Sequence, residues 1–161
     1  MDLVLRPTRT GDREWIADAL NAQWGSVAVV SRGRLTEDAS LLSGLVAERD
    51  DRPVGFALLR RDGDEGEVVV LQSLEPRSGV GTALLQRARE EAGRSGLRRL
   101  WLITTNDNLE AIRFYQRCGW DWVCFHRDAL DESRRIKPSI PKVGAHGIPL
   151  RHELEFELVT G

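Results

Sequence analysis

The feature that most constrains the fold is an apolar strand that leads through a glycine-rich turn into a helix. Val68-Val69-Val70-Leu71 is a run of four apolar residues, typical of a strand that is covered on both faces at the centre of a sheet. The turn Arg77-Ser78-Gly79-Val80-Gly81-Thr82 follows shortly after it. Apolar residues then recur at helical spacing: Leu84, Leu85, Ala88 and Ala92. We therefore expect a central strand–turn–helix unit.

The turn has the chemistry of an anion site. The first N–H groups of a helix have no partner inside it and carry the positive end of the helix dipole. Gly79 and Gly81 would let the backbone approach a phosphate closely, and Arg77 adds a charged donor. The turn therefore predicts a pyrophosphate site, although a tight turn that needs glycine only for packing would leave the same pattern.

Further strands and helices flank this unit. Residues 45–48 and 54–59 predict an antiparallel hairpin across the turn Asp50–Pro53. Other strands are expected at 3–5, 100–103, 120–126 and 154–158, and helices from Asp12 onward and over 109–117. This order is a mixed α/β (α+β) pattern around one sheet, and we expect residues 1–161 to form a single domain.

Two segments have no regular pattern. Residues 24–34 combine two glycines with a short apolar run, and we interpret them as loop. Residues 134–152 contain three prolines and two glycines and predict an irregular excursion. This excursion is basic and has no acidic residue; its cationic side chains are Arg134, Arg135, Lys137, Lys142 and Arg151.

Composition excludes several classes of function. The net charge of -2 and the pI of about 6.0 argue against a nucleic-acid partner. No stretch approaches the roughly 20 apolar residues of a membrane span, and Met1–Pro7 does not resemble a signal peptide. The two cysteines, Cys118 and Cys124, fit a reducing cytoplasm, and the spacing of cysteines and histidines matches no usual metal site. We expect a cytoplasmic protein with no metal and no membrane partner.

A second motif follows the glycine helix after one intervening strand. Residues 108–120 read Asn-Leu-Glu-Ala-Ile-Arg-Phe-Tyr-Gln-Arg-Cys-Gly-Trp. Together the two motifs resemble the GNAT acetyltransferase superfamily, over about Leu3 to Arg127. The second motif is matched at five positions: Asn108, Ala111, Tyr115, Gly119 and Trp120. The resemblance implies a mixed, mostly antiparallel sheet of about six to seven strands with about four helices.

In that family the central strand splays from its neighbour, and the pantetheine arm of acetyl-CoA inserts between them. The resemblance implies acetyl-CoA as co-substrate and a splay around Gln72-Ser73-Leu74, whose backbone would bond the pantetheine amides. Asn108 would bond the cofactor near the pantetheine end. The pyrophosphate would lie at the turn formed by Arg77, Ser78, Gly79, Val80, Gly81 and Thr82.

The resemblance also implies a general acid but leaves the general base open. Tyr115 would protonate the departing thiolate, although a tyrosine on an amphipathic helix can serve packing alone. Two positions depart from the family pattern: Pro76 stands where a Gln or Arg is usual, and Ile103 where some members carry Glu. The candidate bases are Glu67 and Glu65, acting through water, and His126, with Glu67 preferred. The alternative is that water and backbone carbonyls serve without a side-chain base.

These observations predict an N-acetyltransferase that moves acetyl directly to a primary amine of a small molecule. The alternatives are an acyl-CoA sensor without turnover and an acetyltransferase for protein N-termini or lysines. In GNAT folds the connection between the last two strands lies over the acceptor end of the cleft, and residues 134–152 are that connection here. Their basic side chains predict a positively charged pocket for an amine that also carries a carboxylate or phosphate. The alternative to such a pocket is that the segment is only a solvated basic loop.

Dimers are frequent among similar proteins, so a homodimer is a further expectation.

Overall fold

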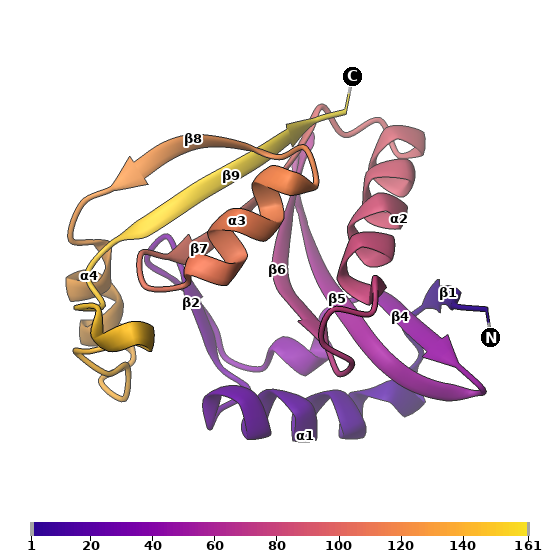
Figure 1. Ribbon diagram of the computed structural model, residues 1–161, viewed down its shortest axis with the longest axis horizontal. Helices are drawn as coiled ribbons and strands as arrows, with labels where there is room; N and C mark the ends of the chain where they lie inside the picture. Colours follow the sequence, from indigo (N-terminus) through magenta and orange to yellow (C-terminus); the bar gives the residue numbers. More distant parts are fainter. Residues whose placement is uncertain (1, 161) are drawn as a thin grey trace.

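The computed structural model describes residues 2–160 and contains a seven-stranded sheet in the order β1-β4-β5-β6-β7-β9-β8 (Figure 1). Its strands are β1 Val4–Pro7, β4 Gly44–Arg49, β5 Arg52–Asp62, β6 Glu65–Ser73, β7 Arg99–Thr105, β8 Asp121–His126 and β9 Glu153–Val159. Neighbouring strands are antiparallel except β6 and β7, which are parallel. The predicted mixed, mostly antiparallel sheet is confirmed, and the apolar run in β6 lies at its centre.

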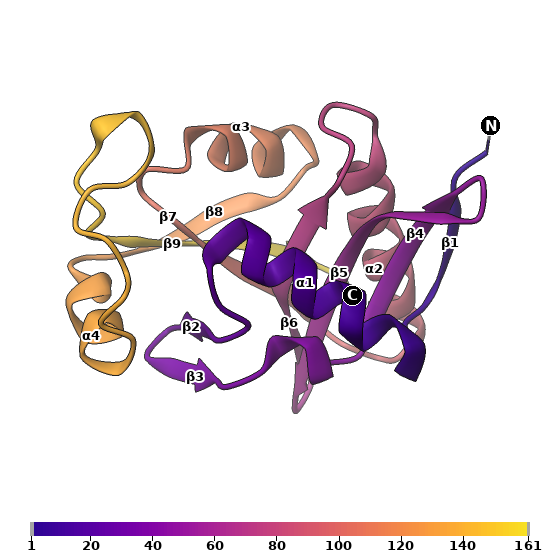
Figure 2. The ribbon, with the colours of Figure 1, turned by 90° about the horizontal axis from the view of Figure 1, so that it is seen from below.

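The helices cover both faces of this sheet. α1 (Arg13–Trp24) lies against one face, across β5 and β6 (Figure 2). α2 (Val80–Arg94) and α3 (Leu109–Arg117) lie on the opposite face, and α4 (Ala129–Ile136) lies beside the end of β8. None of the helices within residues 2–160 combines the length and the apolar character needed to cross a membrane.

Each face has its own apolar core. On the α1 side, Ile16 and Leu20 pack against Phe56, Leu58 and Val70. On the other side the expected stripe of α2 is buried against the sheet, which confirms the helical spacing seen in the sequence. The buried residues of this stripe are Val80, Leu84, Leu85, Ala88 and Ala92. β6 is covered on both faces because it contributes to both cores.

Two hairpins have tight turns with left-handed backbone. Asp50 and Asp51 have φ of 55° and 60° and join β4 to β5, which confirms the predicted hairpin. Arg32 and Gly33 have φ of 51° and 71° and join β2 (Val29–Ser31) to β3 (Arg34–Thr36). The interpretation of residues 24–34 as loop is therefore wrong for this hairpin, because strands of three residues are too short to show an alternating pattern.

The excursion at 134–152 is mostly irregular, as predicted, but its beginning is not. α4 extends to Ile136, and a short 3-10 turn spans Ala145–Gly147. The Arg134 side chain donates to the carbonyl oxygens of Pro141 (2.8 Å) and Leu150. This guanidinium therefore holds the two arms of the excursion together and is not available as a free surface charge.

Gly55 on β5 is predicted to be essential for packing beneath the start of α2. A Cβ at Gly55 would lie 2.5 Å from Val80 Cγ1 and 2.9 Å from Gln72 O. We expect Gly55→Ala to lower the free energy of unfolding by about 1–3 kcal/mol in urea denaturation, because the core cannot accept the extra methyl. Gly93→Ala is the control, since nothing lies within 4 Å of its Cβ. Equal stabilities of the two variants would contradict this packing argument.

Candidate functional site

β6 and β7 separate after only three residue pairs. Glu65–Glu67 pair with Arg99–Trp101, and among the described residues the parallel ladder continues no further (Figure 2). From Val68 onward β6 therefore has a free edge on its β7 side, while β7 remains paired with β9 along its whole length. The sequence placed this splay around residues 72–74. That position is wrong, because the strands part at Val68.

A β-bulge accounts for the early separation. Leu58 pairs with Val70 and Leu59 pairs with Val68, so Val69 is an extra residue without a partner on β5. A bulge bends its strand and increases the local twist. β6 thus turns away from β7 at the point where the ladder between them ends.

The glycine turn follows the free edge and begins α2. Gly79 is the N-cap with φ of 82°, and the Ala83 N–H donates the first helical hydrogen bond, to Gly79 O (3.0 Å). In the described part of the chain, the amides of Val80, Gly81 and Thr82 donate no backbone hydrogen bond. The predicted cluster of unpaired amides is present.

The two turn glycines serve different needs. Gly79 needs its positive φ, which L-residues with a Cβ rarely adopt. Gly81 has an ordinary helical backbone, but a Cβ there would lie 3.1 Å from Phe114 Cζ. Gly81 therefore lets α2 lie against α3, which is the packing role that the sequence analysis left open for the glycines of this turn.

Arg77 lies exposed in the turn with φ of 55°. No carboxylate of residues 2–160 lies within ion-pair distance of it, whereas the neighbouring Glu75 pairs with Arg49. The hydroxyls of Ser73 and Ser78 both donate to Glu75 O, the first at 2.8 Å. These bonds hold the turn rigid and leave the Arg77 guanidinium free for a ligand.

The backbone of β6 offers fewer groups to the open edge than expected. The Leu74 N–H donates to Val54 O (2.8 Å), and Gln72 O lies beside Gly55, so both point toward β5. Neighbouring residues of a strand direct their N–H and C=O groups to opposite sides. Of the three residues predicted for pantetheine, Ser73 alone therefore directs its backbone into the opening.

Tyr115 lies on α3 and faces the sheet among other aromatic rings. Its ring centroid is 5.4 Å from that of Phe114, 6.2 Å from Trp120 and 5.6 Å from Phe156. Burial raises the pKa of the Tyr115 hydroxyl above its ordinary value, because the phenolate would lose its hydration. Within residues 2–160 this hydroxyl has no hydrogen-bond partner, so it is a protonated and available donor.

Asn108 begins the same helix. Its Oδ1 accepts from the Ala111 N–H (3.2 Å), which makes it the N-cap of α3. Asn108 also lines the cavity described next, so its side chain can do more than cap the helix.

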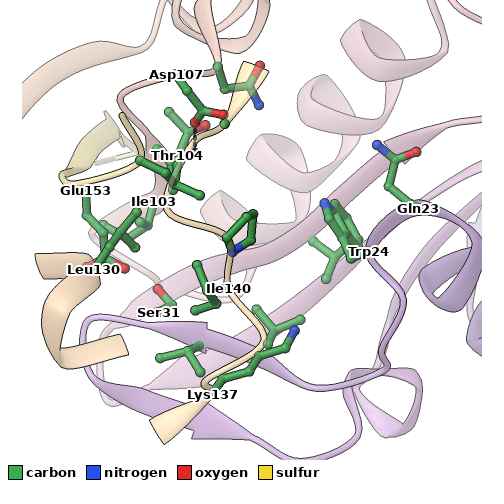
Figure 3. Close-up of a pocket in the computed structure, with 18 of the residues that line it drawn as sticks. Gln23, Trp24, Ser31, Ile103, Thr104, Asp107, Leu130, Lys137, Ile140 and Glu153 are labelled. Carbon is green, nitrogen blue, oxygen red and sulfur yellow. Dashed lines mark hydrogen bonds between the residues drawn. The ribbon is translucent and has the colours of Figure 1, made fainter. Parts of the chain in front are cut away.

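A cavity of about 710 Å³ opens on the α1 side of the separated strands (Figure 3). Its walls come from β2, from the bulge of β6 at 68–70, from the end of β7 and from the excursion at 137–150. Most of the lining is apolar and includes Trp24, Val29, Val69, Ile103, Leu130 and Ile140. The excursion thus closes one side of the cavity.

Three charged side chains line this cavity: Asp107, Lys137 and Glu153. Asp107 is occupied by the fold, since it accepts from the Ala145 N–H (2.8 Å) and from the Thr105 hydroxyl. Lys137 Nζ donates to Ala28 O (2.8 Å), and burial lowers the pKa of its ammonium. Lys137 alone among the basic residues of the excursion lines the cavity, so the pocket is less basic than the sequence suggested.

Comparison with known proteins identifies the family. The model of the Acetyltransferase (GNAT) family matches residues 13–120, which include both motifs. The chain belongs to the GNAT family. The uncharacterized protein YdhI of Bacillus subtilis (strain 168) is 33% identical over 159 residues, which cover 98% of each chain.

Solved GNAT structures share the fold. An acetyltransferase of Bacillus subtilis in complex with CoA has a TM-score of 0.70 at 17% identity, over 98% of this chain and 99% of the other. A GNAT acetyltransferase of Elizabethkingia anophelis with acetyl-CoA bound has a TM-score of 0.69 at 16% identity, over 98% and 97%. Membership of the GNAT family supports an acyltransferase.

The three base candidates of this GNAT chain lie outside the cavity lining. Glu65 contacts Arg98 and Arg99, and His126 Nε2 lies 3.1 Å from Glu155 Oε1, so the fold engages both. Glu67 is 2% exposed, and both its oxygens accept from Arg60 Nη2, at 2.9 and 3.3 Å. Burial raises the pKa of the Glu67 carboxyl, against the opposing charge of Arg60.

Most polar residues of the cavity, among them Ser31 and Glu153, were missed by the sequence analysis. Ser31 lies in the hairpin that was interpreted as loop. Glu153 is the first residue of β9, a strand that the sequence predicted from its alternating apolar and acidic residues without assigning a role to the acidic ones. The alternation of acidic and apolar residues in 153–158 does indicate that Glu153 faces away from the α2 core. It does not indicate what covers that face.

Arg77→Gly is expected to separate stability from coenzyme affinity. Glycine removes the strain of φ 55°, so the free energy of unfolding should stay equal or rise by up to about 1 kcal/mol. The loss of the guanidinium should weaken CoA binding about 3- to 10-fold in calorimetry, because one charge-assisted hydrogen bond to phosphate is lost. Unchanged affinity would show that the backbone amides alone hold the phosphate.

Proposed function

We propose that the protein transfers an acetyl group from acetyl-CoA directly to a primary amine of a small molecule. The observation that carries this proposal is the free edge of β6, which leads to unpaired amides at the start of α2. An extended chain can add to a free strand edge, and a pyrophosphate can bind at a helix N-terminus. Acetyl-CoA has both parts in this order.

The residues that would bind acetyl-CoA follow from this arrangement. The backbone of Ser73 would bond a pantetheine amide at the open edge of β6. The amides of 80–82 would donate to the pyrophosphate, with Arg77 as the charged donor. Asn108 would contact the coenzyme where its arm enters the cavity. The Ser78 hydroxyl would support the turn through its bond to Glu75 O.

The proposed reaction is a direct transfer. Acetyl-CoA supplies the acetyl group as a thioester. The unprotonated amine nitrogen forms a bond to the carbonyl carbon, the carbon–sulfur bond breaks, and the departing thiolate takes a proton from the Tyr115 hydroxyl. The extra proton on the new amide nitrogen then passes through solvent to the Tyr115 phenolate, which restores the hydroxyl. The hydroxyl is protonated at neutral pH and can donate, and burial, which raises its pKa, makes it a weaker acid than a solvated tyrosine.

The amine must first lose a proton, and Glu67 is the proposed acceptor of it. The raised pKa of the Glu67 carboxyl brings it closer to the working pH of a general base. Because Glu67 lies outside the cavity lining, the proton would pass through a water or through Ser31, which lines the cavity on the neighbouring β2 strand.

Lys137 supports an acceptor that carries an anionic group. It is the cation that lines the cavity, and its ammonium contacts a backbone carbonyl, with no carboxylate of residues 2–160 within ion-pair distance. A carboxylate or phosphate of the acceptor would supply the missing counter-charge. The apolar lining around it favours an acceptor with an apolar body.

Tyr115→Phe tests the general acid. It removes one oxygen and keeps the ring packed against Phe156, so we expect turnover to fall about 10²- to 10³-fold. The Kd of CoA in calorimetry should stay within about twofold, because the hydroxyl acts on the leaving group. Normal turnover by the variant would remove Tyr115 from the mechanism.

Lys137→Met tests the anion preference, with Lys142→Met as the control from the same excursion outside the cavity. We expect the ratio of kcat/KM for carboxylate-bearing amines over their carboxamides to fall about tenfold in Lys137→Met, because a charge-assisted contact is lost. The Lys142→Met variant should keep the original ratio. The same ratio in both variants would contradict the role of Lys137.

The deciding experiment is release of free thiol from acetyl-CoA with a panel of amines, amino acids and peptides. Acetylation of small amines supports the proposal. Coenzyme binding without thiol release would favour an acyl-CoA sensor, and acetylation of peptides alone would favour a protein acetyltransferase. Absence of coenzyme binding would overturn all three.

A further inference from the structure

Glu153 is a buried carboxylate that lines the cavity from β9. It is 1% exposed, and its neighbours across the sheet are Thr105 on β7 and His126 on β8. Its oxygens contact the turn of the β2–β3 hairpin: Arg32 Nη1 lies 3.2 Å from Oε1, and the Arg32 N–H lies 3.3 Å from Oε2. A carboxylate is rarely this buried unless its charge is matched.

The charge of Glu153 is only partly satisfied by hydrogen-bond donors. Asp12, another buried carboxylate, accepts four hydrogen bonds at 2.6 to 3.0 Å, from Arg6, Arg9 and Trp15. Glu153 accepts two, both longer than 3.1 Å, and the side chain of its partner Arg32 is 40% exposed. A carboxylate can accept about four hydrogen bonds, so Glu153 has room for further donors.

A second buried group beside Glu153 also lacks a partner. Ser31 precedes Arg32 in the chain, is 7% exposed and lines the same cavity. Its Oγ has no hydrogen-bond partner at ordinary distance within residues 2–160, but it lies close enough to Glu67 to favour the charged form of that carboxyl. A buried hydroxyl without a close partner is unfavourable, so a polar ligand atom in the cavity would be stabilising there.

The two groups lie together in the cavity. In Figure 3, Glu153 and Ser31 lie on one side of it, and the Lys137 ammonium points to the other side. The lining between them is mostly apolar. The cavity therefore has an acceptor-rich end and a cationic end, separated by apolar walls.

We propose that Glu153 and Ser31 form the subsite that binds the ammonium group of the acceptor, while Lys137 binds an anionic group at its other end. The acceptor is then a zwitterion with an apolar body, such as an apolar amino acid. Glu153 selects amines over uncharged analogues. This inference rests on the proposed acetyl transfer, since it names the acceptor of that reaction.

Glu153→Gln tests the subsite with little change in shape, since the amide oxygen can still accept one of the two hydrogen bonds from Arg32. Glu155→Gln is the matched control: it lies two residues along the same strand face, outside the cavity, and contacts Arg99 and His126. With the best amino acid from the panel, we expect KM to rise at least about tenfold in Glu153→Gln. KM should change less than about twofold in Glu155→Gln. The Kd of CoA should be unchanged in both.

A second measurement separates ammonium binding from a structural role. The KM of the best acceptor is compared with the competitive Ki of its alcohol analogue, in which a hydroxyl replaces the amine. The wild type should bind the amine at least about tenfold more tightly than the alcohol, and Glu153→Gln should bind the two within about twofold. A structural defect would weaken both equally. In Ser31→Ala, the affinity for the amine should fall about two- to fivefold.

The outcomes distinguish this inference from the proposed function. If amines are acetylated and the ratio of amine to alcohol binding is the same in Glu153→Gln and the wild type, the subsite is overturned while acetyl transfer stands. If no amine in the panel is acetylated, the proposed function fails and the subsite with it. A loss of the ratio in Glu153→Gln alone supports the subsite.

Discussion

The separation of β6 from β7 is the constraint on which the site depends. Three residue pairs join the strands, and the bulge at Val69 then turns β6 away. Strand edges normally pair or are covered, so an internal edge left free in a seven-stranded sheet needs a reason. Here the free edge leads on one side to the amides of α2 and on the other to the cavity. In the function proposed above, the same backbone irregularity would join the site of a phosphate-bearing chain to the site of a second reactant.

The cavity is assembled from segments that are distant in the sequence. The turn at Arg32 contacts Glu153, which lies 121 residues further along the chain. Asp107 holds the excursion through the Ala145 amide, and Gly144 permits this approach, since a Cβ there would lie 2.1 Å from Asp107 Oδ2. The walls of the cavity are therefore held by side-chain to backbone contacts between loops. The free edge of β6 and the amides at the start of α2, in contrast, belong to one continuous strand, turn and helix.

Buried charge is distributed unevenly around the opening. Glu67 is held by Arg60 beneath the hairpin, with its pKa raised by burial, whereas Glu153 faces the cavity with long contacts to Arg32. A buried ion pair contributes little net stability because desolvation offsets the attraction between its charges. Neither carboxylate is therefore explained by a large contribution to stability, and the subsite proposed above would give Glu153 a role in binding.

The sequence by itself determined the central strand, the glycine turn and its helix, and the Tyr115 helix, because each is a local pattern of spacing and turn residues. It also indicated the family, since both motifs lie within short stretches. The tertiary structure alone decided where β6 leaves β7, that Gly81 is required by Phe114, and that Ser31 and Glu153 meet at one cavity. These features depend on strand register and on contacts between distant segments. Neither is encoded in the periodicity of a single stretch of chain.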